Sequence, residues 1–313
     1  MFQFEYLNSS HLFRNNTELN ESGKLTVMNL RCDLHSHSTV SDGTLTPTEL
    51  INRAVEKGVE MFALTDHDAT EGLHEAATEA SKFALPFIPG IELSVTWSHQ
   101  TVHILGLGIN PDEVILNKGL ATLREFRASR GEEIARKLEK AGLEQPLEGA
   151  KKFANGEILS RTHFARYLVE QGKAKDVRDV FKRFLVKGKP GYVAGQWASL
   201  EDALSWIHWA GGIAVIAHPA RYKFSATRLR QLINEFKEMG GLGFEAISGS
   251  HSHDEELRML LLAKQHDLFI SKGSDFHSPE NIYRELGVMQ DIPEGSTPIW
   301  HSDAWRERIG TLP

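Results

Sequence analysis

The 313-residue sequence has a single cysteine, Cys32, so it cannot form an internal disulfide. This excludes a disulfide-stapled secreted fold and favours a reducing compartment. No apolar run approaches the roughly 18–20 residues that a membrane-spanning helix needs. Residues 1–27 are polar and lack the charged-then-apolar order of a secretory signal. We expect a cytoplasmic protein without a membrane partner, in which residues 1–27 are a disordered leader or precede the true start at Met28.

Charged residues are abundant but unevenly distributed. With 41% hydrophobic and 25% charged residues, the composition is that of one large globular domain, or of one domain carrying a smaller module. Residues 111–191 contain 18 Lys and Arg against 12 Asp and Glu, whereas the remainder contains 17 against 30. This asymmetry suggests that one part holds a polyanion, which is processed at metals bound by the other. A charged helical surface without a partner explains the same numbers.

Seven short apolar runs have the near-continuous hydrophobic character of strands that are covered on both faces. These runs span residues 31–35, 61–65, 86–91, 102–107, 213–217, 243–247 and 268–272. Helical patterns separate several of them, at about 46–58, 71–83, 199–210 and 254–266. The first helix begins with Thr46 as N-cap and has Glu49 at the capping-box position. This alternation predicts an α/β fold, either a parallel β/α barrel or a doubly wound sheet.

The basic segment 111–191 interrupts the alternation. It has helix-like stretches at about 118–142, 161–171 and 175–185, and no convincing strand. We therefore predict a mostly helical, substrate-binding insertion at 111–191, set between the two parts of the α/β domain, residues 28–110 and 192–313.

Histidines and acidic residues recur at the ends of the predicted strands, where functional side chains of a β/α barrel gather. His35 and His37 are two residues apart and share a face of the first strand, as do Asp275 and His277 after the seventh. The remaining candidates follow strands one, two, three and five or begin strand four: Asp42, His67, Glu92, His218 and His103.

Each of these motifs is weak alone, because a single histidine at a strand end is more often a satisfied core or surface group. Nine such groups in one chain favour a metal site instead, since burying all of them without compensation costs several kcal/mol. A cluster of divalent cations would satisfy all of them, which makes the nine side chains both metal ligands and catalytic residues. Mixed imidazole and carboxylate ligands suit Mn²⁺, Fe²⁺ or Zn²⁺, and the lack of thiolates speaks against a structural zinc site.

The motifs DLHSHS, SDG, TDHD, PGIE, HILG, AHP and GSDFH, in this order, resemble those of the polymerase-and-histidinol-phosphatase (PHP) superfamily. The stretches SDGTLTP and SRTHFAR are similar to its RNase AM branch, which includes 3′,5′-nucleotide bisphosphate phosphatases. The resemblance covers about residues 30–290. It implies a distorted (β/α)7 barrel with a trinuclear metal site, and it favours three Mn²⁺ ions.

The resemblance also implies how the ligands divide. The first ion would take His35, His37, Glu92 and Asp275. The second would share Glu92 and take His103 and His218, and the third would take Asp42, His67 and His277. Many PHP phosphatases have histidine in place of Asp42, and the aspartate fits the RNase AM branch. Asp33 and Asp66 sit beside ligands, and we expect them to orient histidine tautomers.

Several basic residues are candidates for holding substrate. Arg161, His163 and Arg166 lie on a helix that starts at Ser160, so Arg161 is near a helix N-terminus, which favours phosphate. Arg124, Arg127 and Arg130 recur every three residues and could form a second stripe. The alternative is a solvated helix face, which is a better explanation for Arg124 and Arg127 than for Arg130. Arg221 follows the fifth strand and is a candidate phosphate clamp. His251 follows the sixth strand and is either a substrate contact or a surface histidine.

These observations predict a metal-dependent phosphoesterase that hydrolyses nucleotide phosphoesters. A basic pocket would hold a 5′-phosphate, so the substrates would be 5′-monophosphorylated RNA, degraded from 5′ to 3′, and nucleoside 3′,5′-bisphosphates. The alternatives are a phosphomonoesterase of the histidinol-phosphatase type, a non-catalytic scaffold module and a DNA proofreading exonuclease. No obligate protein partner is evident from the sequence.

Overall fold

The computed structural model describes residues 30–154, 156 and 158–310, so the expected leader at 1–27 lies outside the described residues. A single sheet of seven strands follows the chain order. The strands are β1 (Cys32–Asp33), β2 (Met61–Leu64), β3 (Phe87–Trp97), β4 (Gln100–Leu107), β5 (Ile213–Ile216), β6 (Gly243–Ser248) and β7 (Phe269–Gly273). All seven predicted strands are therefore present.

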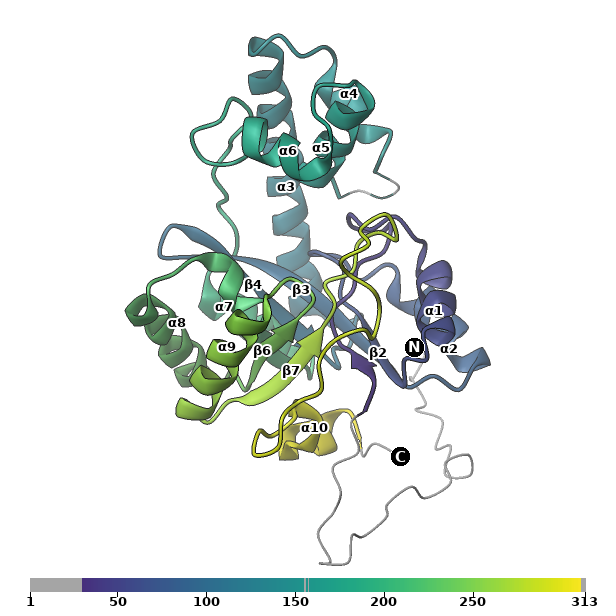
Figure 1. The fold of residues 1–313 in the computed structure, drawn as a ribbon, viewed down its shortest axis with the longest axis vertical. Coiled ribbons are helices and arrows are strands. Elements are labelled where there is room, and N and C mark those ends of the chain that lie inside the picture. The colour runs from purple at the N-terminus through teal and green to yellow at the C-terminus, as the bar shows by residue number, and fades with distance from the viewer. Residues whose placement is uncertain (1–29, 155, 157, 311–313) are drawn as a thin grey trace, which may run out of the picture.

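The sheet curls into a barrel (Figure 1). Its first and last strands meet where the Leu34 amide donates to the Lys272 carbonyl at 3.1 Å, and a parallel bridge joins Ser36 to Phe276. The distorted seven-stranded barrel is confirmed. The prediction of a parallel barrel is wrong for one strand, because β4 runs antiparallel to both β3 and β5.

A two-residue turn causes this departure. Ser98 and His99 join β3 to β4 with φ of 47° and 63°, the positive values of a tight hairpin turn. The hairpin extends β3 to Trp97, beyond the predicted end at 91. It also places His103, near the start of β4, at the same end of the barrel as the C-terminal ends of the parallel strands.

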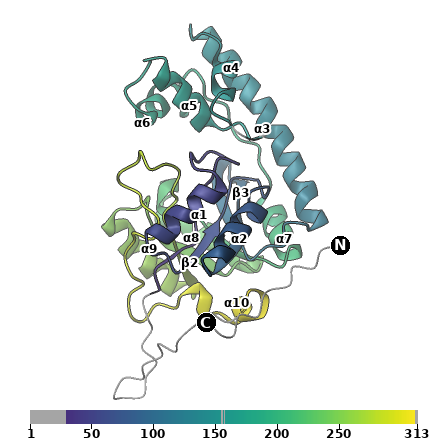
Figure 2. The same ribbon diagram turned by 90° about the vertical axis from the view of Figure 1, so that its right-hand side faces the viewer.

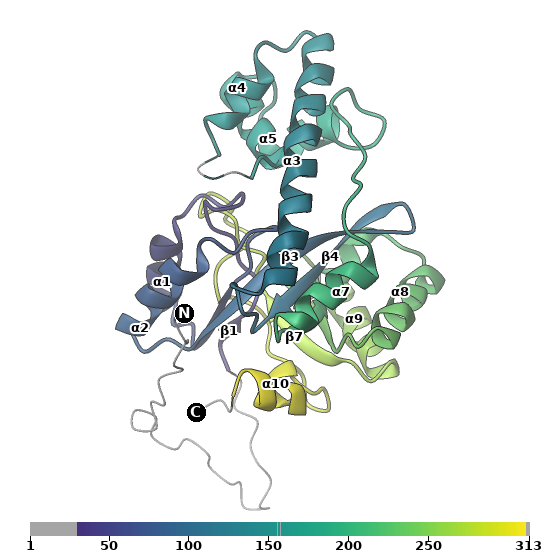
Figure 3. The same ribbon diagram turned by 180° about the vertical axis from the view of Figure 1, so that it is seen from behind.

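Helices pack around the outside of the barrel, with α1 and α2 on one side and α7 to α9 on the other (Figures 1 and 3). They are α1 (Pro47–Glu56), α2 (Leu73–Lys82), α7 (Leu200–Trp209), α8 (Ala226–Glu238) and α9 (His253–Gln265). Thr46 and Glu49 form the predicted capping box at the start of α1. The main hydrophobic core lies between these helices and the sheet, and includes Leu50, Ile91 and Phe236.

The inside of the barrel is apolar at one end only. Cys32, Met61, Leu105 and Val215 form a buried cluster there with Trp305. The short helices η3 (Ile299–His301) and α10 (Asp303–Arg308) complete this end. On β3 and β4, where residues two apart share a face, the rows of Ile88 and Leu105 continue toward the other end to Glu92 and His103.

The segment between β4 and α7, here called the insertion, consists of helices and the loops that join them. It contains α3 (Val114–Lys140), α4 (Pro146–Lys151), α5 (Arg161–Glu170), α6 (Val177–Val180) and η1 (Phe181–Leu185). These helices enclose a separate hydrophobic cluster that includes Leu138, Phe164 and Leu168. Figure 2 shows the insertion above the polar end of the barrel, joined to it by the long helix α3. Within the described ranges, no helix is both long and apolar enough to cross a membrane.

Candidate metal centre

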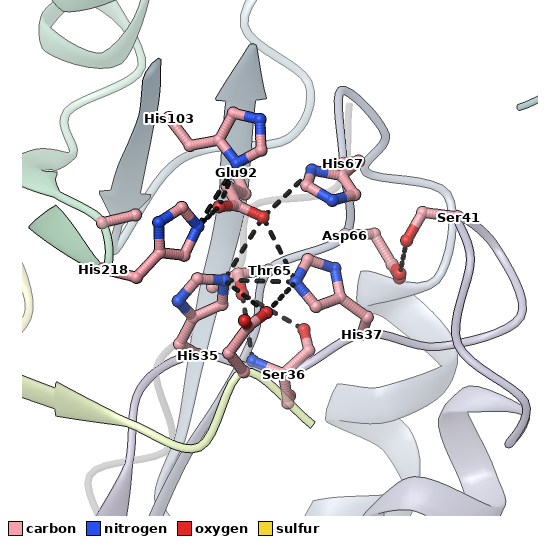
Figure 4. Close-up of polar contacts among 12 residues, drawn as sticks. His35, Ser36, His37, Ser41, Thr65, Asp66, His67, Glu92, His103 and His218 are labelled. Atoms are coloured by element: carbon pink, nitrogen blue, oxygen red, sulfur yellow. Dashed lines mark hydrogen bonds and ion pairs between the residues drawn. The ribbon is translucent and has the colours of Figure 1, made fainter. Parts of the chain in front are cut away.

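The first strand delivers two histidines to the polar end of the barrel. Just beyond β1, the Ser36 amide donates to Thr65 Oγ1 at 3.1 Å, and the Ser36 hydroxyl donates to the Ala63 carbonyl at 2.7 Å. These bonds turn Ser36 toward the neighbouring strand, as its place between two candidate ligands predicts. His35 and His37 are fully buried and converge on the interior (Figure 4).

Glu92 lies at the centre of the cluster (Figure 4). It is fully buried on β3, paired with Leu105 of β4, and His103 shares the inward face with Leu105. Oε1 of Glu92 is 2.8 Å from Nδ1 of His103 and 2.9 Å from Nε2 of His218. The hairpin and the end of β5 therefore bring two imidazoles to one carboxylate oxygen.

The other oxygen of Glu92 faces three further histidines. Its Oε2 is 3.2 Å from Nε2 of both His35 and His37. It is also 2.9 Å from Nδ1 of His67. The two Nε2 atoms of His35 and His37 are themselves 3.1 Å apart. One carboxylate thus joins five imidazoles from four separate segments of the chain.

Asp42 and Asp275 complete the cluster. Oδ1 of Asp42 is 3.2 Å from Nε2 of His277 and 4.0 Å from Nε2 of His67. Oδ1 of Asp275 is 3.5 Å from both Nε2 of His37 and Nδ1 of His277. The structure therefore brings together all nine side chains that the sequence predicts as ligands.

The donor atoms fall into four overlapping groups, within each of which the atoms lie within 4.8 Å of one another. The groups are His37, Asp42, His67 and His277; His35, Glu92 and His218; His35, His37 and Asp275; and His67, Glu92 and His103. Oε2 of Glu92, Nδ1 of His67 and Oδ1 of Asp42 are buried without a hydrogen-bond partner among the described residues. Such atoms are costly to bury unless a cation or proton satisfies them. The donor set fits divalent cations that accept imidazole and carboxylate ligands.

A carboxylate that the sequence did not indicate fixes one of the imidazoles. Oε1 and Oε2 of Glu245 are 3.0 and 3.2 Å from Nδ1 of His35. Glu245 Oε2 also accepts the amide of His218 at 2.5 Å. Because Nδ1 of His35 donates to Glu245, its Nε2 is left facing Glu92. No motif marks Glu245, whose only signal is a lone acidic residue within an apolar strand.

The aspartates that we expected to orient histidines act on the backbone instead. Asp33 accepts the amides of His35, Ser274 and Gly287 at 3.3, 2.8 and 3.0 Å. Asp66 accepts from the amide and hydroxyl of Ser38, at 2.8 and 2.6 Å, and from the hydroxyl of Ser41 at 2.5 Å. The expectation for Asp33 and Asp66 is therefore wrong, because each side chain points away from the imidazoles into a backbone turn.

The surroundings of the buried histidines shift their pKa values in opposite directions. Burial lowers the pKa of His67 to about 4 and that of His218 to about 3, so both imidazoles are neutral at pH 7. Burial also opposes the charge on His37, but the nearby carboxylates of Asp275 and Glu92 raise its pKa to about 9. The first two are ready to donate an electron pair, whereas His37 must first lose a proton.

Two arginines contact the outer oxygen of Asp275. Arg221 Nη1 donates to Oδ2 at 2.7 Å, and Arg284 Nη1 donates to the same oxygen at 2.8 Å. The Arg221 side chain remains 47% exposed, so it lies at the edge of the centre and reaches solvent. Sequence analysis indicated Arg221 but missed Arg284, which lies in an irregular segment seven residues after the last ligand.

The predicted substrate residues of helix α5 differ in their surroundings. Arg161 stacks over Phe181 at 5.4 Å. Arg166 donates to the backbone carbonyls of Asp42 and Gly43, and His163 is 1% exposed. The Arg161 side chain makes no hydrogen bond with another described residue, whereas Arg166 and His163 are hydrogen-bonded to the backbone.

The two other predicted contacts are also bound to the backbone. Arg130 is 8% exposed and donates to the Val193 carbonyl at 3.1 Å. His251 Nδ1 is 3.3 Å from the Ala246 carbonyl, and its Nε2 accepts the Ala220 amide at 3.3 Å. With both ring nitrogens occupied, His251 holds the loop after β6 and shows no atom directed at a substrate.

Comparisons with known proteins agree with this geometry. The family model described as the PHP domain matches residues 33–208. A 3′,5′-nucleoside bisphosphate phosphatase of Chromobacterium violaceum is 51% identical over 269 residues, covering 86% of this chain and 94% of that protein. The 5′-3′ exoribonuclease Rnm of Escherichia coli is 45% identical over 270 residues, covering 86% and 92%. A solved structure from Bifidobacterium adolescentis, described as a metal-dependent phosphoesterase, is 25% identical with a TM-score of 0.73, covering 90% and 96%.

Proposed function

Because the chain belongs to the PHP domain family, we propose that it is a hydrolase that uses divalent cations to cleave phosphoester bonds of nucleotides. The more specific proposal is two activities at one site. The first is 5′-to-3′ degradation of 5′-monophosphorylated RNA, and the second is removal of the 3′-phosphate from nucleoside 3′,5′-bisphosphates. Two relatives are named 3′,5′-nucleoside bisphosphate phosphatase and 5′-3′ exoribonuclease, at 51% and 45% identity and nearly full length.

The observation that carries the proposal is the convergence of nine side chains, in which five buried atoms have no hydrogen bond within the described chain. We assign His35, His37, Glu92 and Asp275 to a first cation, Glu92, His103 and His218 to a second, and Asp42, His67 and His277 to a third. The ligand chemistry fits Mn²⁺, with Fe²⁺ or Zn²⁺ as alternatives. Bound cations supply Lewis acidity, which lowers the pKa of water and offsets charge on a phosphate.

The protein's own residues would orient the substrate. Arg221 and Arg284 hold the outer oxygen of Asp275, so the inner oxygen faces the histidines. Arg221 also reaches solvent, and we propose that it binds the phosphate that is cleaved. His67 and His218 stay neutral at pH 7 because burial lowers their pKa values, which keeps them available as ligands.

A second cluster of positive charge supports a pocket for the 5′-phosphate. Burial and then the nearby charges of Arg161 and Arg127 lower the pKa of Arg130 to about 9. Burial and then Arg127 likewise lower the pKa of Arg161. Like charges held this closely favour an anion between them. Arg161, at the start of α5, is the residue that we propose binds the 5′-phosphate.

The test compares substrates that differ in one group. Metal-free protein is reconstituted with Mn²⁺ and given RNA with a 5′-phosphate, the same RNA with a 5′-hydroxyl, adenosine 3′,5′-bisphosphate and histidinol phosphate. We expect turnover of the phosphorylated RNA and the bisphosphate, and poor turnover of the other two. Efficient hydrolysis of histidinol phosphate without RNA cleavage would identify a small-molecule phosphomonoesterase instead.

The variant Arg161→Gln tests the proposed 5′-phosphate pocket. Arg161→Gln should reduce kcat/KM for 5′-phosphorylated RNA by roughly 10- to 100-fold, the value of one hydrogen bond to a charged group. The same change should leave the 5′-hydroxyl RNA nearly unaffected. Arg178→Gln, which removes an exposed arginine of the same insertion, is the matched control. Equal losses on both RNA ends would contradict the assignment of Arg161.

A further inference from the structure

Helix α5 of the insertion holds the barrel loop that carries Asp42. The Ser160 hydroxyl, at the N-cap of α5, donates to Oδ2 of Asp42 at 3.1 Å. Arg166 donates to the Asp42 carbonyl at 2.7 Å and to the Gly43 carbonyl at 3.3 Å. His163 is buried beside the backbone of Ser41, and its Nδ1 accepts the Ser160 amide at 3.2 Å. Three side chains from one face of α5 therefore contact three successive residues of the loop.

The barrel holds the same loop from its other side. Asp66 accepts from the hydroxyls of Ser38 and Ser41 at 2.6 and 2.5 Å. A Cβ atom on Gly43 would lie 2.3 Å from the carbonyl oxygen of His37, so the loop is packed directly against the ligand-bearing backbone. With both sides held, the position of Asp42 depends on the insertion as well as on the barrel.

These contacts also select which oxygen of Asp42 faces the centre. Ser160 occupies Oδ2, and the other oxygen, Oδ1, lies 3.2 Å from Nε2 of His277 without a hydrogen bond. The Ser160 hydroxyl accepts the Thr162 amide at 3.0 Å, so its single proton is directed at Asp42. The carboxylate is thereby presented to the centre in one orientation.

We propose that Ser160 and Arg166 are positioning residues for the cation held by Asp42, His67 and His277, and that α5 couples the insertion to that cation alone. The inference rests on the proposed metal centre. The two proposed cations that share Glu92 would take all their ligands from the barrel, where Glu245 orients His35. Arg161, our proposed phosphate ligand, directly follows Ser160 on α5. A phosphate bound at Arg161 would hold the start of α5 in place and so strengthen binding of this cation. Because such coupling is reciprocal, the cation would strengthen binding of the phosphate by the same factor.

The experiment measures metal binding rather than turnover. Mn²⁺ is titrated into metal-free protein, and the signal of free aqueous Mn²⁺ in electron paramagnetic resonance gives the bound equivalents and their affinities. We expect Arg166→Gln and Ser160→Ala to weaken one class of bound Mn²⁺ by roughly 10- to 100-fold, as outer partners of metal ligands do. The remaining equivalents should bind as in the wild type. Asp42→Ala should remove the same class and serves as the reference.

Matched controls separate positioning from loss of stability. Arg136→Gln removes an arginine of the same insertion that pairs with Glu133 on the exposed face of α3. Ser225→Ala removes the N-cap of α8. Both controls should keep the wild-type Mn²⁺ titration. Unchanged titrations for Arg166→Gln and Ser160→Ala would overturn the proposal. If Arg166→Gln fails to fold, Ser160→Ala, which removes one hydroxyl group, still decides the question.

Activity then distinguishes this proposal from a direct substrate contact. With weakened metal binding, turnover by Arg166→Gln should return toward the wild-type value as Mn²⁺ is raised, with little change in KM. A raised KM that excess Mn²⁺ does not correct would make Arg166 a substrate ligand and overturn its positioning role. Failure of the wild type to hydrolyse any of the phosphoesters would refute the proposed function, whereas the Mn²⁺ titrations would still test the coupling.

Discussion

Glu245 shows how a residue outside every motif can control a metal ligand. Its carboxylate accepts Nδ1–H of His35 and the amide of His218, so it fixes a ring and a backbone turn together. His218 has the unusual φ of 27°, which this amide bond helps to hold. Hydrogen bonds of this kind set the histidine tautomer and raise its strength as a ligand.

The variant Glu245→Gln should therefore weaken metal binding without removing a ligand. The amide side chain of this variant has one oxygen in place of two, so it cannot accept both the His35 Nδ1–H and the His218 amide as the carboxylate does. The His35 ring is therefore held less firmly. We expect Mn²⁺ affinity to fall roughly 10- to 100-fold, measured by titration of the metal-free protein. Glu256→Gln, a change at another buried carboxyl that accepts from the backbone of Ser248, is the control. Wild-type affinity in Glu245→Gln would contradict the assigned role.

His37 makes metal binding dependent on pH. Burial opposes its charge, yet Asp275 and Glu92 raise its pKa to about 9 in the metal-free protein. A cation needs the neutral ring, so binding must release this proton at any pH below that value. Burial likewise opposes the charge on His35, but Glu245 and Glu92 raise its pKa well above the usual value, so this ligand must also lose a proton. Mn²⁺ affinity should therefore rise by at least about tenfold per pH unit between pH 7 and 9. Calorimetry in buffers of different ionisation enthalpy should detect the released proton, and a flat profile would contradict the prediction.

At the scale of elements, the sequence predicts where strands occur better than which way they run. All seven apolar runs became strands, and most of their residues are buried. The direction of β4 was not predicted, since Ser98 and His99 are not the Asn-Gly or Asp-Gly pair that signals a tight hairpin. Helix α8 was also missed. Its apolar residues, such as Leu229 and Phe236, are spaced among many charges.

Helix α3 is attached to the barrel by an arginine that we expected to be solvated. Arg127 is 6% exposed, and its Nε donates to Oδ2 of Asp68 at 2.7 Å. Asp68 directly follows His67 and also accepts the Ser94 amide at 2.7 Å. The expectation of a solvated face is wrong for Arg127, because the long helix passes over the β3–β4 hairpin (Figure 3).

Removing this arginine should destabilise the protein strongly. Arg127→Ala leaves the buried Asp68 carboxylate without its partner, which costs about 3–5 kcal/mol in comparable sites. Arg124, one turn earlier, pairs with Glu71, whose side chain is 53% exposed. Arg124→Ala should therefore cost at most about 1 kcal/mol. Urea unfolding measures both free energies, and similar values for the two variants would contradict the buried role of Arg127.

At the scale of the whole molecule, the candidate centre was easier to predict than its surroundings. Six of the nine ligands lie within four residues of the C-terminal end of β1, β2, β5 or β7, and barrel closure brings these ends together whatever the details of packing. Arg284 and the contacts of Arg166 could not be predicted in this way. They depend on how an irregular segment and an inserted helix meet the barrel, which no local pattern determines.

The charge of the insertion is likewise a poor guide to how much RNA it can hold. Its 18 basic residues suggest a broad track for a polyanion. Most of its arginines instead contact acceptors within the protein: Arg124, Arg127, Arg130, Arg136, Arg166 and Arg183. Arg161 and, from the barrel, Arg221 remain the proposed phosphate ligands. With these arginines occupied, we expect the site to hold one or two phosphates rather than a long strand.

The salt dependence of RNA binding tests whether the site holds only one or two phosphates. Each phosphate contact on single-stranded RNA contributes about −0.7 to the slope of log K against log salt, so two contacts give about −1.4. The slope can be measured by fluorescence anisotropy with 5′-phosphorylated RNA and the Asp42→Ala variant, which we expect to be inactive. RNAs of increasing length should give the same slope, because only the 5′ end is held. A slope of about −3 or steeper that grows with length would mean that the basic helices follow the RNA backbone, despite their internal contacts.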